Sequence, residues 1–75
     1  PPLPPLADRC DTAVRQIRWA AEDKGEHIAI LEARKQYAWY LKGVAHANYY
    51  KEQIVRMNTL EDVDRITEGI KRDLK

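Results

Sequence analysis

The sequence predicts an all-α fold, a small four-helix bundle preceded by a proline-rich linker. Apolar residues recur every three or four positions along most of the 75 residues, which is the spacing of one buried helix face. Glycines and a helix-capping signal interrupt this pattern at short intervals, and no segment alternates apolar and polar residues as a strand does. A chain of this length forms one small domain. We therefore assign residues 1–6 to the linker and residues 7–75 to the helical domain.

The linker contains all four prolines of the chain within its first five residues. Proline fixes φ and restricts the residue before it, so the segment is predicted to be extended, as in polyproline II. We interpret it as a spacer that follows another domain of the same protein. A ligand for a proline-binding module is the alternative, but no basic residue closely flanks the run.

The first helix is predicted over residues 8–24, with Gly25 at its end. Its buried stripe consists of Cys10, Val14, Ile17 and Ala21. Trp19 falls nearly opposite this stripe, which indicates contact with something outside the helix pair, such as a missing domain.

The second helix is predicted to follow Gly25 and to run to Lys42, with Gly43 as a left-handed C-cap. Apolar residues occupy most of its sides, which is typical of the central helix of a bundle. Its main stripe consists of Ile30, Ala33, Tyr37, Leu41 and Val44.

The third helix is predicted over about residues 46–57, and the fourth begins after Thr59. Thr59 is a good N-cap, and Asp62 three residues later makes the pattern close to a capping box. Acidic residues occupy the first turn of the fourth helix and basic residues its last turn, which matches the helix dipole.

Catalytic and metal-binding patterns are missing from the sequence. His27 and His46 each lack a second ligand at metal spacing, and there is no Cys-x-x-Cys or glycine-rich phosphate loop. Cys10 has no evident base nearby and is predicted to be a small core residue. We therefore predict no catalytic residue, cofactor or metal in this chain. No apolar run reaches membrane-spanning length, and a single thiol without a signal peptide favours the cytoplasm.

Basic and aromatic residues are concentrated in the middle of the chain. The net charge is only +1, but residues 33–51 hold Arg34, Lys35, Lys42 and Lys51 without any acid, and also five of the six aromatic residues. Helical spacing places Lys35 and Lys42 on one face, with Arg34 on one side of it and Trp39 on the other. Basic groups bind phosphates and aromatic faces stack on unpaired bases, so this segment is predicted to bind RNA. The spacing leaves open a merely solvated face, and a buried position for Trp39.

The same segment resembles a family signature. Residues 34–43 read Arg-Lys-Gln-Tyr-Ala-Trp-Tyr-Leu-Lys-Gly, which is similar to the Arg-Lys-x-x-x-Trp-Tyr-x-Lys-Gly pattern of bacterial tRNA-dihydrouridine synthases, in particular their DusB-like branch. Weaker similarity extends over roughly residues 5–74. The family reduces uridine to dihydrouridine in tRNA. An N-terminal TIM barrel carries FMN and the catalytic cysteine, NADPH supplies electrons, and the C-terminal helical domain helps to hold the tRNA.

The resemblance implies that this chain is a helical tRNA-binding domain and not an enzyme by itself. tRNA and the catalytic barrel of the same protein would be its partners, and FMN and NADPH would belong to that barrel. Cys10 does not match the catalytic cysteine. The tRNA contacts are assigned to Arg34, Lys35 and Lys42, with Lys51 as a weaker candidate and Trp39 as a stacking residue.

One position departs from the family pattern, and two other functions compete. Many relatives have a Pro-Gly or Arg-Gly pair where this chain has Ala45 and His46, so that turn is expected to differ in shape. A protein-interaction module would use Trp19 and other exposed aromatics as anchors. A helix-turn-helix DNA-binding domain would need a more basic recognition helix than residues 46–57 provide.

Overall fold

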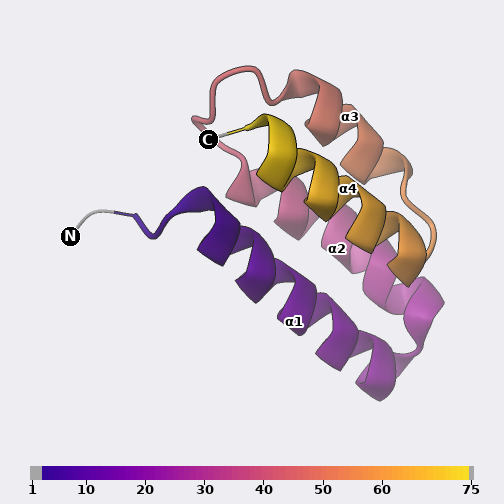
Figure 1. The fold of residues 1–75 in the computed structure, drawn as a ribbon. Helices are drawn as coiled ribbons and strands as arrows, with labels where there is room; N and C mark the ends of the chain where they lie inside the picture. The colour runs from indigo at the N-terminus through magenta and orange to yellow at the C-terminus, as the bar shows by residue number, and fades with distance from the viewer. Residues whose placement is uncertain (1–2, 75) are drawn as a thin grey trace.

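The computed structural model describes residues 3–74 and contains four α-helices in this range (Figure 1). They are α1 (Leu6–Lys24), α2 (Glu26–Tyr40), α3 (Asn48–Arg56) and α4 (Leu60–Asp73). The predicted all-α four-helix bundle is therefore confirmed. Pro1 and Pro2 of the predicted linker and Lys75 of the predicted domain lie outside the described residues.

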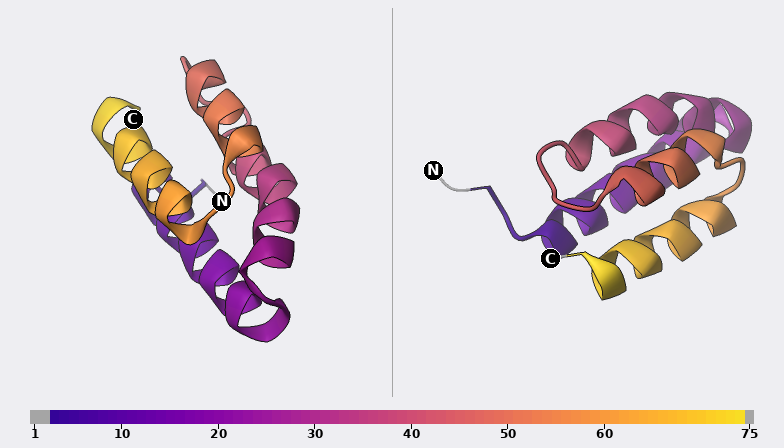
Figure 2. Two further views of the ribbon diagram at one scale, coloured as in Figure 1. Left: turned by 90° about the vertical axis from the view of Figure 1, so that its right-hand side faces the viewer. Right: turned by 90° about the horizontal axis from the view of Figure 1, so that it is seen from above.

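Each helix packs against its neighbour in sequence, and α4 returns to α1 (Figure 2). The contact between α1 and α2 is the most extensive, and a single residue, Gly25, joins the two helices. Residues 3–5 leave the bundle at the end where α2 runs into the turn before α3 (Figures 1 and 2). This arrangement leaves the outer side of the α1–α2 hairpin free of α3 and α4.

A buried polar contact lies within the apolar core. The hydroxyl of Tyr37 on α2 and that of Thr67 on α4 are 2.6 Å apart and hydrogen-bonded. Cys10 is completely buried, as expected for a core residue, and burial raises the pKa of its thiol. The core side chains are Leu6, Cys10, Ala13, Ile17, Ile30, Ala33, Tyr37, Leu41, Ala47, Tyr50, Ile54, Met57, Val63, Ile66, Ile70 and Leu74.

The first helix begins two residues earlier than predicted, and Leu6 belongs to the bundle and not to the linker. Leu6 is buried in the core, and the amide of Arg9 donates to the carbonyl of Pro5 at 3.0 Å. Pro5 itself has φ −53° and ψ 150°, close to polyproline II, so the extended segment ends there. Burial of Leu6 explains the shift, because an apolar side chain gains free energy when the helix carries it into the core.

The second and third helices are shorter than predicted. Helix α2 ends at Tyr40, because the amides of Leu41 and Lys42 bond to carbonyls only three residues back and tighten the chain into a turn. Gly43 has the expected positive φ of 81°, but it lies within this turn. Helix α3 ends at Arg56 because Met57 is extended.

The capping box predicted for the last helix is present. The amide of Asp62 donates to the Thr59 hydroxyl at 3.0 Å, and the Asp62 carboxylate accepts from the amide of Thr59 at 3.2 Å. The amide of Asn58 donates to the same carboxylate oxygen at 2.8 Å. These amide donors, Asn58 first, hold the pKa of Asp62 below its usual value.

We expect the capping box to make stability depend on pH. The lowered pKa of Asp62 means that its contribution is complete above the unfolded value of about 3.9 and is lost as pH falls through the folded value. Asp62→Ala should lower the free energy of unfolding by about 1 kcal/mol at pH 7 and by much less at low pH. Urea denaturation at several pH values measures both. Glu61→Ala is the control, and an equal, pH-independent loss in the two variants would contradict the prediction.

Close packing at Gly69 predicts an unusual response to alanine. A Cβ at Gly69 would lie 2.8 Å from Cε1 of Tyr50, whose hydroxyl donates to the Asp73 carboxylate and holds the ring in place. The clash should cost about 1–3 kcal/mol, more than the gain in helix propensity of about 1 kcal/mol. Gly69→Ala is therefore expected to lower Tm, whereas in a Tyr50→Leu background it should raise Tm. A higher Tm for Gly69→Ala alone would show that the ring moves freely.

Candidate nucleic-acid interface

Two of the predicted RNA-binding lysines are exposed and free of carboxylates. Lys35 lies on α2 and Lys42 lies in the turn that follows α2. Within residues 3–74, neither forms an ion pair, whereas Lys24 and Lys71 are paired with Glu32 and Asp11. Charges without an internal partner remain available for an external anion.

Arg34 is held away from these lysines. Its Nε donates to the carbonyl of Met57 at 2.9 Å, and its other guanidinium nitrogen donates to the side-chain oxygen of Asn58 at 2.8 Å. Arg34 therefore fastens α2 to the turn between α3 and α4. The sequence prediction placed it beside Lys35 on one basic ridge, and this placement is wrong. Consecutive residues on a helix point in different directions, and α2 packs against both α1 and α3. The side chain of Arg34 therefore reaches the turn after α3, whereas that of Lys35 is exposed to solvent.

Lys51 is also separate from the two lysines. It lies half-buried on α3 and lines neither of the two grooves that Trp39 lines. Lys51 is therefore not part of the candidate site.

Trp39 is the centre of the candidate site. Its side chain is 67% exposed, which answers the question that helical spacing left open. It lines two grooves on the outer side of the α1–α2 hairpin. We call the first the linker groove, of about 380 Å³, lined by Leu3, Pro4, Asp8, Arg9, Thr12, Trp39, Tyr40 and Lys42. The second, the helix groove, has about 370 Å³ and is lined by Gln16, Lys35, Gln36, Trp39 and Tyr40.

Tyr40 connects α2 to α1 beside Trp39. Its ring centroid is 6.4 Å from that of Trp39, and its hydroxyl donates to Oε1 of Gln16 on α1 at 3.0 Å. Its backbone carbonyl accepts a hydrogen bond from Arg9 at 3.3 Å. Both bonds cross from α2 to α1, so the wall next to Trp39 is fixed by the hairpin.

Helix α1 supplies groove residues that the sequence reasoning missed. Asp8, Arg9 and Thr12 line the linker groove, so an acid stands beside the segment that contains none of its own. A signal for them was present: with a one-residue turn at Gly25, positions at similar distances on either side of it lie close together, and the side chain of Arg9 reaches the carbonyl of Tyr40. The basic residues Arg9 and Lys42 outnumber Asp8 in this groove.

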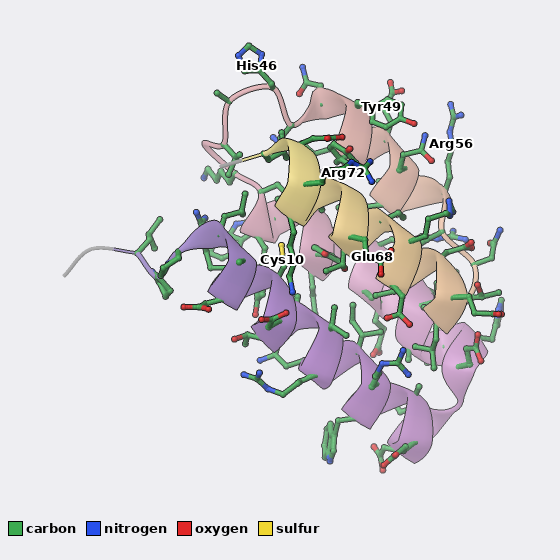
Figure 3. All side chains as sticks on the ribbon, viewed as in Figure 1. Cys10, His46, Tyr49, Arg56, Glu68 and Arg72 are labelled. Carbon is green, nitrogen blue, oxygen red and sulfur yellow. The ribbon has the colours of Figure 1, made fainter. Side chains whose placement is uncertain are left out.

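His46 occupies an exposed turn beyond the end of α2 (Figure 3). Its φ is 63°, in the left-handed region that glycine adopts most readily. The position thus keeps a glycine-like backbone although the side chain is a histidine. His46 lines neither groove.

The described residues contain neither a metal-binding cluster nor a membrane-spanning helix. No group of three or more His, Cys, Asp or Glu side chains that could hold a metal ion occurs within residues 3–74. None of the four described helices is both long and apolar enough to cross a bilayer.

Comparison of the chain with protein-family models, curated proteins and solved structures gives no match. Lys35, Trp39 and Lys42, with the two grooves that they line, are the features of this surface that bear on binding.

The contrast between Arg34 and Lys35 can be tested directly. Arg34→Gln removes two hydrogen bonds from the turn before α4, so it should lower the free energy of unfolding by about 1–3 kcal/mol. Lys35→Gln loses the same charge from an exposed position and should change it by less than about 0.5 kcal/mol. Urea denaturation of the two variants makes the comparison. Equal stability of both would show that the Arg34 contacts contribute nothing.

Proposed function

We propose that this domain binds tRNA and positions it for the reduction of uridine by a separate catalytic domain, as the helical domain of tRNA-dihydrouridine synthases does. The observation that carries the proposal is Trp39, which is two-thirds exposed and separates a groove lined by Lys35 from a groove lined by Lys42. In this proposal FMN and NADPH act in the catalytic domain, and this chain supplies binding only, in the cytoplasm.

Electrostatics supports the proposal. Lysines that bind phosphates release condensed counterions from the nucleic acid, and this release favours binding at moderate salt. Lys35 and Lys42 are not paired with any carboxylate in the described chain, so neither has to break an internal ion pair in order to bind a phosphate. Two such contacts give modest affinity, which suits a domain that assists another one.

The fixed aromatic surface is a second support. An exposed indole can stack on an unpaired base, and such stacking contributes about 1–3 kcal/mol per base. Tyr40 is anchored to Gln16 and Arg9 on α1, and it stands directly beside Trp39. Because Tyr40 is already fixed beside the indole, little conformational entropy is lost at this wall of the groove on binding.

A protein-interaction surface is the second candidate. Trp19 on α1 is 68% exposed, and Ile28 and Leu31 on α2 are also exposed. Trp19 and Leu31 are each six residues from the Gly25 turn, so the hairpin brings them level near its closed end. Exposed apolar residues of this size are typical of a surface that another protein or domain covers. This surface is compatible with tRNA binding at the open end of the same hairpin.

Removal of both free lysines should weaken tRNA binding and its salt dependence. We expect Lys35→Gln combined with Lys42→Gln to reduce the slope of log K against log salt by about 1–2, since each phosphate contact contributes about 0.7–0.9. Titration of fluorescently labelled tRNA at several salt concentrations measures affinity and slope together. Duplex DNA of similar length as competitor distinguishes RNA binding from general attraction to phosphate.

A matched control keeps the loss of charge constant. Arg15 and Arg56 are exposed, lie on α1 and α3, and have no carboxylate partner among residues 3–74 (Arg56 is labelled in Figure 3). Arg15→Gln combined with Arg56→Gln should leave most of the slope in place. If this control loses as much affinity as the lysine variant, the attraction is diffuse and the proposed site is wrong.

A further inference from the structure

The linker groove combines two apolar walls with charged groups. Leu3 and Pro4 line it from the segment before α1, and Trp39 and Tyr40 line it from the end of α2. Its volume of about 380 Å³ is in the range of small-molecule sites, which bury flat and mostly apolar ligands between such walls. Leu3 is 73% exposed, so this wall lacks a covering partner within the described chain.

The polar residues of the groove have unused hydrogen-bonding capacity. The guanidinium of Arg9 makes one hydrogen bond, to the carbonyl of Tyr40, and its Nε is buried without an acceptor among residues 3–74. Lys42 has no ion pair there either. With the carboxylate of Asp8, the groove carries two positive charges and one negative charge, a net excess of one positive charge.

We propose that the linker groove holds one unpaired nucleotide of a bound RNA, with the base against Trp39 and the phosphate near Lys42 and Arg9. This inference rests on the proposed RNA-binding function and adds the form of RNA that the site selects. One nucleotide within a strand carries one negative charge, which balances the excess positive charge of the groove. Its base edge also offers N–H groups to Asp8 and acceptors to Thr12.

Only an unpaired base can enter between these walls. In a duplex both faces of a base are covered by its stacked neighbours, whereas an unpaired base can stack on an aromatic side chain. The helix groove lies on the other side of Trp39, where Lys35 and Gln36 can receive the adjoining backbone. The strand thus crosses Trp39 with a lysine on either side. An apolar peptide side chain would fill the walls but leave Arg9 and Lys42 without an acceptor.

Fluorescence of Trp39 tests the inference. The variant Trp19→Phe keeps Trp39 as the one tryptophan of the chain. A single-stranded hexauridylate should quench its emission in a saturable manner, and a fully paired RNA duplex at the same nucleotide concentration should quench it far less. In this background Trp39→Leu, followed by anisotropy of labelled hexauridylate, should weaken binding about tenfold and leave the salt slope unchanged.

Tyr49→Leu is the matched control, because Tyr49 is 63% exposed on α3 (Figure 3) and lines neither groove. Its affinity for hexauridylate should stay within twofold. If tRNA binding depends on Lys35 and Lys42 but Trp39 is not quenched, or is quenched equally by duplex, the nucleotide site is wrong while RNA binding stands. If no RNA binds at all, both proposals fail. Quenching by an acidic hexapeptide but not by RNA would assign the groove to a protein.

Discussion

The turn at Gly25 is the constraint on which the candidate site depends. Gly25 joins the two longest helices by itself and has a φ of 93°, a conformation that side chains disfavour. With one residue between them, α1 and α2 must run antiparallel in one register. In this hairpin Arg9 donates to the carbonyl of Tyr40, and the Tyr40 side chain reaches along α1 so that its hydroxyl donates to Gln16. The walls on both sides of Trp39 follow from these two contacts.

Ion pairs within the described chain neutralise some charged side chains of the bundle surface and leave others free. Arg18 with Asp64 and Lys71 with Asp11 join α1 to α4, so these two carboxylates are neutralised by cations of the same protein. Exposed pairs of this kind add little stability, but they neutralise their side of the molecule. Lys35 on α2 and Lys42 in the turn after it have no such partner within residues 3–74, and they stand in a segment of the sequence without acids. A net charge of +1 for the whole chain therefore conceals a local positive surface.

Local features of the sequence predicted the fold well, and contacts across the bundle could not be predicted. Helical stripes and the capping box at Thr59 depend on residues a few positions apart, which the sequence shows directly. The partner of Arg34 is a backbone carbonyl 23 residues away, and no pattern of side chains marks it. Exposure of Trp39 likewise depends on which side of α2 the other helices leave uncovered. Lys35 and Lys42 were placed correctly as exposed residues, but Asp8 and Arg9 enter the site only through the hairpin.

Leu3 and Pro4 are at once the end of the extended segment and a wall of the linker groove. A molecule that occupies the groove also fixes the direction in which the polypeptide leaves the bundle. Such coupling is reciprocal: an interaction that orients this segment changes the binding free energy in the groove by the same amount as occupation of the groove changes the free energy of that interaction. Pro4 and Pro5 strengthen this coupling, because proline fixes φ and limits the directions that the backbone beside the groove can take.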